Sequence, residues 1–115
     1  LGRGNICINT GGEKIYPEEV EATLKSNAQV HDCVVVGVPD DRWGQVITAV
    51  VEPRAGARPS AEALQEHVRE HLAGYKVPRH VLTIDTIGRA ASGKADYQRI
   101  KAWAMAQLGV SPANR

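Results

Sequence analysis

The sequence predicts an α+β fold, in which a small mixed β-sheet is flanked by about three helices. Two β-rich runs, "HDCVVVGV" and "QVITAVVE", suit the centre of a sheet. Three other segments carry apolar residues at helical spacing. The elements do not alternate strand and helix as a parallel nucleotide-binding sheet requires. A length of 115 residues suits one domain with a modest core.

The start of the chain predicts a hairpin followed by a helix. "ICIN", residues 6–9, alternates apolar and polar side chains, Gly11 and Gly12 supply a tight turn, and "EKI" continues extended. Pro17 then suits the first turn of a helix. The expected buried stripe of this helix has three members: Tyr16, Val20 and Leu24. Three acidic residues suit the positive end of its dipole: Glu18, Glu19 and Glu21.

The remaining elements follow in order. "PDDRWG" separates the two β-rich runs as a turn, and "PRAGARP" forms a loop after the second. Ser60 is the expected N-cap of a helix that Gly74 terminates. The apolar stripe of that helix is Leu64, Val68 and Leu72. "RHVLTI" is a strand, "GRAASGK" a loop, and "GVSPANR" a frayed tail. The last helix is marked by Tyr97, Ile100, Ala104 and Leu108.

Composition excludes several classes of protein. The 14 basic and 13 acidic residues leave a net charge of +1, so no large field of one sign attracts nucleic acid or anionic membrane. Cys7 and Cys33 lie in apolar alternating segments, which is typical of buried thiols and of a reducing compartment. No apolar run approaches the roughly 20 residues of a membrane-spanning helix. We expect a cytoplasmic chain with no transmembrane segment and no nucleic-acid partner.

Two short motifs resemble a phosphate loop and a zinc site, but neither is complete. Gly88, Gly93 and Lys94 fit a phosphate loop, but Ala95 lacks the hydroxyl that would hold magnesium. "HVREH", residues 67–71, matches the inverted zinc motif, yet no third acidic ligand follows, so a solvated helix face is favoured. We therefore predict no metal site in this chain.

Four ordered stretches carry a more specific signal: "LGRGNICINTGGEKIYPEEVE", "VVVGVPDDRWGQVITAVV", "LAGYKVPRHV" and "GRAASGKADY". In order and spacing they resemble the C-terminal domain of the adenylate-forming superfamily, and within it the acyl-CoA synthetases of the fatty-acid or steroid-side-chain type. The resemblance covers nearly the whole chain. It implies an AMP-forming ligase that makes an acyl-adenylate from ATP and then transfers the acyl group to coenzyme A. The small domain would be a lid that presents a different face for each step.

The resemblance also implies an organisation. Residues 1–5 would be a hinge remnant, 6–108 the lid domain and 109–115 a tail, in a fragment of a longer chain that does not catalyse alone. The expected partner is a large N-terminal domain of the same polypeptide, which holds magnesium with the ATP. The large domain would also hold the acyl chain, and the expected small-molecule partners are ATP or AMP, the acyl substrate and coenzyme A.

Site residues follow from the same resemblance. Lys94 matches the adenylation lysine that bridges the substrate carboxylate and the ATP α-phosphate. Such a cation offsets the repulsion between two anions forced together, and Ser92 and Gly93 would make its loop mobile. Arg3 matches an arginine that contacts the nucleotide ribose. Asn5 falls at the hinge position, with an ordinary turn residue as an equal alternative.

The coenzyme A face is implied by six positions: Gly11, Gly12, Glu13, Trp43, Tyr75 and Arg79. The glycines match a loop along the pantetheine tunnel, although a hairpin turn also explains them. Glu13 resembles an acid that orients a histidine of the large domain, or is a surface charge. Trp43 matches a tunnel wall or caps the core. Tyr75 and Arg79 match positions that stack on the adenine and pair with phosphates.

Alternatives remain at this point. The chain also resembles lids of aryl-CoA ligases, luciferase-like enzymes and peptide-synthetase adenylation domains. From another class, a free-standing module would bind a phosphate ligand at "GRAASGK" without a reaction. A catalytic Lys94 would be open to acylation, which removes its charge.

Overall fold

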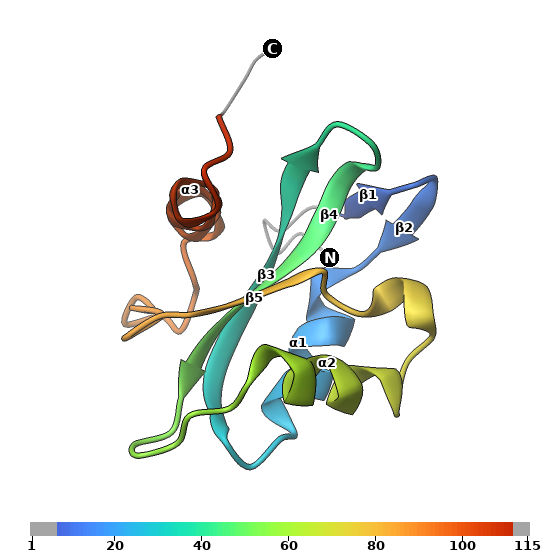
Figure 1. Cartoon of the computed structure of the whole chain (residues 1–115). Coiled ribbons are helices and arrows are strands. Elements are labelled where there is room, and N and C mark those ends of the chain that lie inside the picture. The colour runs from blue at the N-terminus through green and yellow to red at the C-terminus, as the bar shows by residue number, and fades with distance from the viewer. Residues whose placement is uncertain (1–6, 112–115) are drawn as a thin grey trace.

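The computed structural model describes residues 7–111, in which a twisted sheet lies between α3 on one side and α1 with α2 on the other (Figure 1). The strands are β1 (Ile8–Thr10), β2 (Glu13–Ile15), β3 (Val30–Asp40), β4 (Gly44–Pro53) and β5 (His80–Thr83). The helices are α1 (Pro17–Lys25), α2 (Ala61–Arg69), the 3-10 turn η1 (Gly74–Lys76) and α3 (Tyr97–Leu108). The strand order is β2-β1-β4-β3, with β5 paired to β4.

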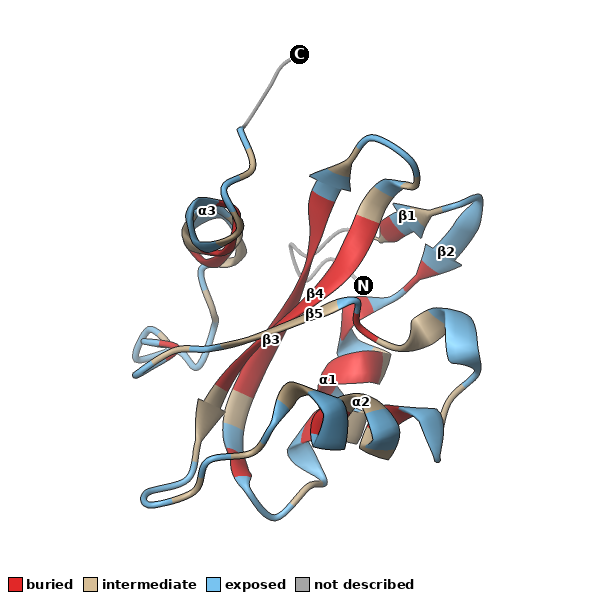
Figure 2. Ribbon diagram, in the orientation of Figure 1, coloured by how far each residue is buried: buried red, intermediate tan, exposed pale blue. Residues whose placement is uncertain are grey.

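The β3–β4 hairpin is the centre of the sheet. Its antiparallel register runs from Asp32 opposite Glu52 to Asp40 opposite Gly44. β5 adds to β4 in parallel, so the sheet is mixed, as the sequence predicts. Both faces of the two long strands are buried (Figure 2), which explains why they read as nearly continuous apolar runs.

Alternate side chains of the hairpin enter two separate cores. One core packs the sheet against α1 and α2 and includes Val20, Val35 and Leu64. The other packs the opposite face against α3 and includes Val36 and Ile100. The central strands are therefore fixed on both sides, and the loops at their ends are held by a rigid scaffold.

Local signals in the sequence account for the helix starts. Pro17 occupies the first turn of α1. The Ser60 side chain caps α2 by accepting from the Ala63 amide at 3.0 Å. The Asp96 side chain caps α3 by accepting from the Arg99 amide at 3.0 Å. The helix starts at Pro17 and Ser60, the N-terminal hairpin turn and the β-rich runs are confirmed, and the Asp96 cap is a finding of the structure.

Four expectations differ in detail. Tyr16 is 57% exposed and precedes α1, so it is not part of the buried stripe. Glu21 is buried, whereas the sequence predicts a carboxylate that interacts with the positive end of the helix dipole. α2 ends at Arg69, before Leu72, and Gly74 begins η1 rather than ending α2. Leu72 still packs against the core from outside the helix.

The two cysteines are free, with Cys33 buried and Cys7 half-buried. Burial raises the pKa of the Cys33 thiol to about 12, which keeps it protonated and unreactive. Within residues 7–111, no helix has the length and apolar character needed to cross a membrane.

Candidate functional site

The turn between β3 and β4 fixes the position of Trp43. The carboxylate of Asp40 accepts hydrogen bonds from the amides of Arg42 and Trp43, at 3.0 and 2.9 Å. The Trp43 carbonyl in turn accepts from the Gly11 amide at 2.9 Å, which joins this turn to the N-terminal hairpin. The half-buried Trp43 ring therefore has a fixed backbone behind it.

Gly11 lies directly against the Trp43 ring. Its φ is +58°, and a Cβ at this position would lie 2.6 Å from Cε3 of Trp43. The neighbouring Gly12 has a φ of +89°, but a Cβ there would meet no atom within 4 Å. The hairpin turn thus requires glycine at position 11, because φ is positive there and a side chain would clash with the Trp43 ring. At Gly12 φ is also positive, but the space beside the backbone is open.

Five of the six residues expected on the coenzyme A face line one hollow of about 360 Å³. They are Gly11, Glu13, Trp43, Tyr75 and Arg79. The Arg79 guanidinium lies 5.0 Å from the centroid of the Trp43 ring, and Arg42 lies 5.5 Å from it. The hollow combines a cation held over an aromatic face with Tyr75, which is 49% exposed. This combination is suited to a planar, anionic ligand.

Lys76 does not share this hollow. Its ammonium donates to the Glu19 carboxylate at 2.8 Å, a contact that joins η1 to α1. That hydrogen bond raises the pKa of Lys76. Lys76 therefore fixes the turn that carries Tyr75, and Tyr75 itself stays exposed.

Lys94 lies in a separate place, on the loop between β5 and α3. Its side chain is exposed and makes no hydrogen bond or ion pair within the described residues 7–111. The loop backbone is folded on itself, because Ala90 donates to the Lys94 carbonyl at 3.0 Å and Gly93 donates to the Ala90 carbonyl at 2.8 Å. These amides are not available to cradle a phosphate, which argues against the phosphate-loop interpretation.

The loop is also less free than its glycine and serine suggest. The Arg89 guanidinium donates to both carboxylate oxygens of Asp32 on β3, at 2.7 and 3.0 Å. The same group donates to the Gly93 carbonyl at 3.0 Å. Sequence reasoning missed both partners, although one signal was present: Asp32 is a charged residue directly before the apolar run at 33–38.

The structure does not bring Lys94 together with the coenzyme A residues. The Lys94 loop attaches at Asp32 and Trp43 is held by Asp40, and these two positions on β3 lie about 26 Å apart at about 3.3 Å per residue. Figure 1 shows the orange loop before α3 and the yellow turn at residues 74–76 on opposite sides of the sheet. Arg3 and Asn5, the expected ribose and hinge residues, lie outside the described residues.

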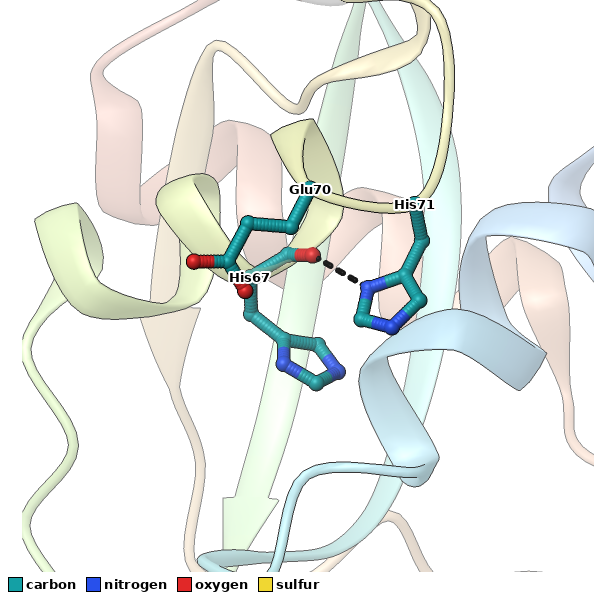
Figure 3. Close-up of side chains that lie close together, drawn as sticks. All are labelled: His67, Glu70 and His71. Atoms are coloured by element: carbon teal, nitrogen blue, oxygen red, sulfur yellow. Dashed lines mark hydrogen bonds between the residues drawn. The ribbon is translucent and has the colours of Figure 1, made fainter.

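The residues of the inverted zinc motif lie side by side at the end of α2 (Figure 3). Ligand atoms of His67, Glu70 and His71 fall within 4.8 Å of one another. His67 is not simply solvated, because its Nε2 lies 2.9 Å from both the Thr23 carbonyl and the Ser26 hydroxyl of the neighbouring helix. His71 Nδ1 lies 2.8 Å from the His67 carbonyl. His67 therefore joins α2 to the end of α1.

Comparison with models of protein families identifies the family of this chain. The model of the AMP-binding enzyme C-terminal domain matches residues 19–94, which include Trp43, Tyr75 and Arg79 and end at Lys94. The chain belongs to this family. As an AMP-binding enzyme C-terminal domain, it has relatives both among curated enzymes and among solved structures.

Two curated relatives match along almost the whole chain. A medium/long-chain-fatty-acid and 3-oxocholest-4-en-26-oate CoA ligase of Mycobacterium marinum is 54% identical over 99% of this chain and 20% of its own length. A 3-oxocholest-4-en-26-oate CoA ligase of Rhodococcus rhodochrous is 49% identical over 99% of this chain and 20% of its own length. The AMP-binding C-terminal domain described here thus spans about a fifth of the length of these relatives.

Solved structures support the fold. An acyl-CoA synthetase of Brucella canis superposes with a TM-score of 0.84 at 27% identity, over 94% of this chain and 20% of that one. An o-succinylbenzoate CoA synthetase of Bacillus subtilis, solved with its acyl-adenylate intermediate, has a TM-score of 0.76 at 37% identity, over 83% of this chain and 19% of that one. The three helices and small sheet described above are therefore the fold of this family.

Proposed function

We propose that this chain is the C-terminal lid domain of an ATP-dependent acyl-CoA synthetase, which converts a carboxylic acid, ATP and coenzyme A to acyl-CoA, AMP and pyrophosphate. The observation that carries the proposal is the separation of two sites on one rigid sheet. A lysine whose side chain has no partner within residues 7–111 lies on a loop at one end of β3, and an aromatic, cationic hollow lies at the other. A lid that serves two steps in turn needs two such faces.

Lys94 is the proposed catalytic residue of the adenylation step. Its ammonium has no partner within the described chain, so it is free to contact the substrate carboxylate and the α-phosphate as they approach. The positive charge stabilises the charge that develops between these anions, an effect typically worth about a hundredfold to a thousandfold in rate. The loop at 88–94 contains no carboxylate, so we assign the magnesium ligands to the large domain.

The hollow at Trp43 is the proposed face for the thioester step. The residues present fit coenzyme A, since Arg79 offers a cation for its phosphates and Tyr75 an exposed ring for its adenine. The open backbone at Gly12 leaves room for a narrow pantetheine arm. Glu13, exposed on the same rim, is available to a histidine of the large domain. The acyl group itself would be bound by that domain.

We infer a fatty acid or a steroid side-chain acid as the substrate class, because the curated relatives named above act on such acids. Arg3 and Asn5 remain the proposed ribose and hinge residues, on the resemblance alone. The free, unreactive Cys33 thiol agrees with a reducing, cytoplasmic setting, which we also propose.

The test of this function is Lys94→Ala in the full-length parent enzyme. We expect acyl-adenylate formation to fall by about a hundredfold or more, because the other cation of the loop, Arg89, is held by Asp32 and does not replace the ammonium. Pyrophosphate release in a single turnover measures this step. Arg58→Ala, which removes an exposed cation from the loop after β4, is the matched control and should change nothing. Unchanged adenylate formation in Lys94→Ala would exclude the assigned role.

A further inference from the structure

Arg89 connects β3 to the Lys94 loop through one guanidinium. Its Nε and Nη2 donate to the two oxygens of Asp32, at 2.7 and 3.0 Å, and its Nη1 donates to the carbonyl of Gly93 at 3.0 Å. Asp32 lies near the start of β3, directly before its fully buried run at 33–38, and Gly93 immediately precedes Lys94. The side chain thus joins the rigid scaffold to the peptide next to the lysine.

The contact between Arg89 and Asp32 is a bidentate, charge-assisted pair of hydrogen bonds, which is a strong type of side-chain contact. A bidentate pair of guanidinium and carboxylate fixes both distance and orientation, which a lysine at this position would not do. Both groups are partly buried, with 28% and 16% of their side chains exposed, so the pair is less screened than a surface ion pair. Lys25 also faces Asp32, at a longer 3.8 Å.

The loop has further anchors at its base. The Ile87 side chain is fully buried, its amide donates to the Glu52 carboxylate at 2.9 Å, and its carbonyl accepts from Arg99 at 2.6 Å. On the far side, the Ala90 amide donates to the Lys94 carbonyl. The backbone around Lys94 is therefore held on both sides, while the Lys94 side chain makes no hydrogen bond or ion pair within residues 7–111.

We propose that Arg89, held by Asp32, is a positioning residue that presents Lys94 to the reacting groups in a fixed loop conformation. This inference rests on the proposed function of Lys94. Its physical basis is preorganisation: a catalytic cation held in place loses little freedom during the reaction, and a displacement of about 1 Å can cost about a hundredfold in rate.

The decisive variant is Arg89→Met in the full-length enzyme, which keeps the length of the side chain and removes all its donors. We expect single-turnover acyl-adenylate formation to fall by about tenfold to a hundredfold. The reaction of preformed acyl-adenylate with coenzyme A should stay within about twofold of wild type, because the Trp43 hollow is at the other end of β3. Equal losses in both steps would mean a merely structural role and would overturn the proposal.

A double variant separates positioning from stability. If Arg89 acts only through Lys94, adding Arg89→Met to Lys94→Ala causes no further loss of adenylate formation. A further loss of tenfold would contradict the proposal. If Lys94→Ala alone keeps adenylate formation, the proposed function fails first; if Lys94→Ala loses it and Arg89→Met does not, only the positioning role fails.

A conservative variant keeps the proposal testable should Arg89→Met not fold. Arg89→Lys retains the charge but not the forked geometry, so we expect an intermediate loss confined to adenylate formation. Full activity in Arg89→Lys would show that the fork is not needed. Amide hydrogen exchange gives a readout besides activity: the amides of Ala90 and Gly93 should exchange faster in either variant, and unchanged exchange would contradict the proposed anchoring.

Discussion

Gly11 and Trp43 define the wall of the hollow through a contact that leaves no space for a side chain. We expect Gly11→Ala to destabilise the chain by about 2 to 5 kcal/mol, because it combines a positive φ with a Cβ 2.6 Å from the ring. Gly12→Ala has the backbone strain without the clash and should cost about 1 to 2 kcal/mol. Urea unfolding measures both. Equal losses of unfolding free energy in the two variants would mean that the contact with the Trp43 ring adds nothing to the cost of Gly11→Ala.

Glu21 is a buried carboxylate that joins α1, β3 and α3. It is 6% exposed and accepts from the Val35 amide at 2.9 Å and the Tyr97 hydroxyl at 2.7 Å. Burial raises the pKa of Glu21, and the nearby charge of Glu18 acts in the same direction. The two hydrogen bonds and the charge of Lys25 lower the pKa but do not cancel the effect of burial.

This raised pKa predicts a dependence of stability on pH. The folded state binds the proton of Glu21 more tightly than the unfolded state, so the contribution is complete below the ordinary pKa of 4.5 and is lost as the pH rises through the folded-state value. We therefore expect Glu21→Gln to gain stability relative to wild type as the pH rises from 4.5 towards 8. Urea unfolding across this range, with the exposed Glu62→Gln as control, measures it. A difference that is constant with pH would contradict the assignment.

Helices and strands were predictable where short-range signals define them, as Pro17 and Ser60 illustrate at the starts of α1 and α2. Contacts between distant residues were not predictable. From the sequence, Glu21 is expected to interact with the dipole of its helix. In the structure, its carboxylate accepts a hydrogen bond from the hydroxyl of Tyr97, 76 residues later in the chain. Arg89 and Asp32 are 57 residues apart, and no periodicity links them. The gathering of five expected residues at one hollow came from the family resemblance, not from local patterns.

α3 is held to the sheet by a small apolar core, in which Ile100 is fully buried. We expect Ile100→Ala to cost about 2 to 5 kcal/mol, because it leaves a cavity between α3 and β3. The change is measured by urea unfolding, with the exposed Gln107→Ala on the same helix as control. A loss under 1 kcal/mol would mean that α3 does not depend on this contact.

As a whole, the molecule is a rigid sheet with different chemistry at its two ends. The long β3–β4 hairpin is buried on both faces and keeps the Lys94 loop and the Trp43 hollow apart. No single position of the domain brings both sites to one substrate, since the residues that anchor them, Asp32 and Asp40, lie about 26 Å apart along β3. A domain that serves two steps with these sites must rotate between them, as hinged domains do.

The measurement that tests this two-faced account most directly is a crossed comparison in the full-length enzyme. Lys94→Ala and Arg79→Ala are each assayed for acyl-adenylate formation and for the reaction of preformed acyl-adenylate with coenzyme A. We predict that Lys94→Ala loses the first step by about a hundredfold and keeps the second, while Arg79→Ala keeps the first and raises the KM for coenzyme A about tenfold in the second. If each variant impairs both steps equally, the two ends of the sheet do not serve separate steps and the account is wrong.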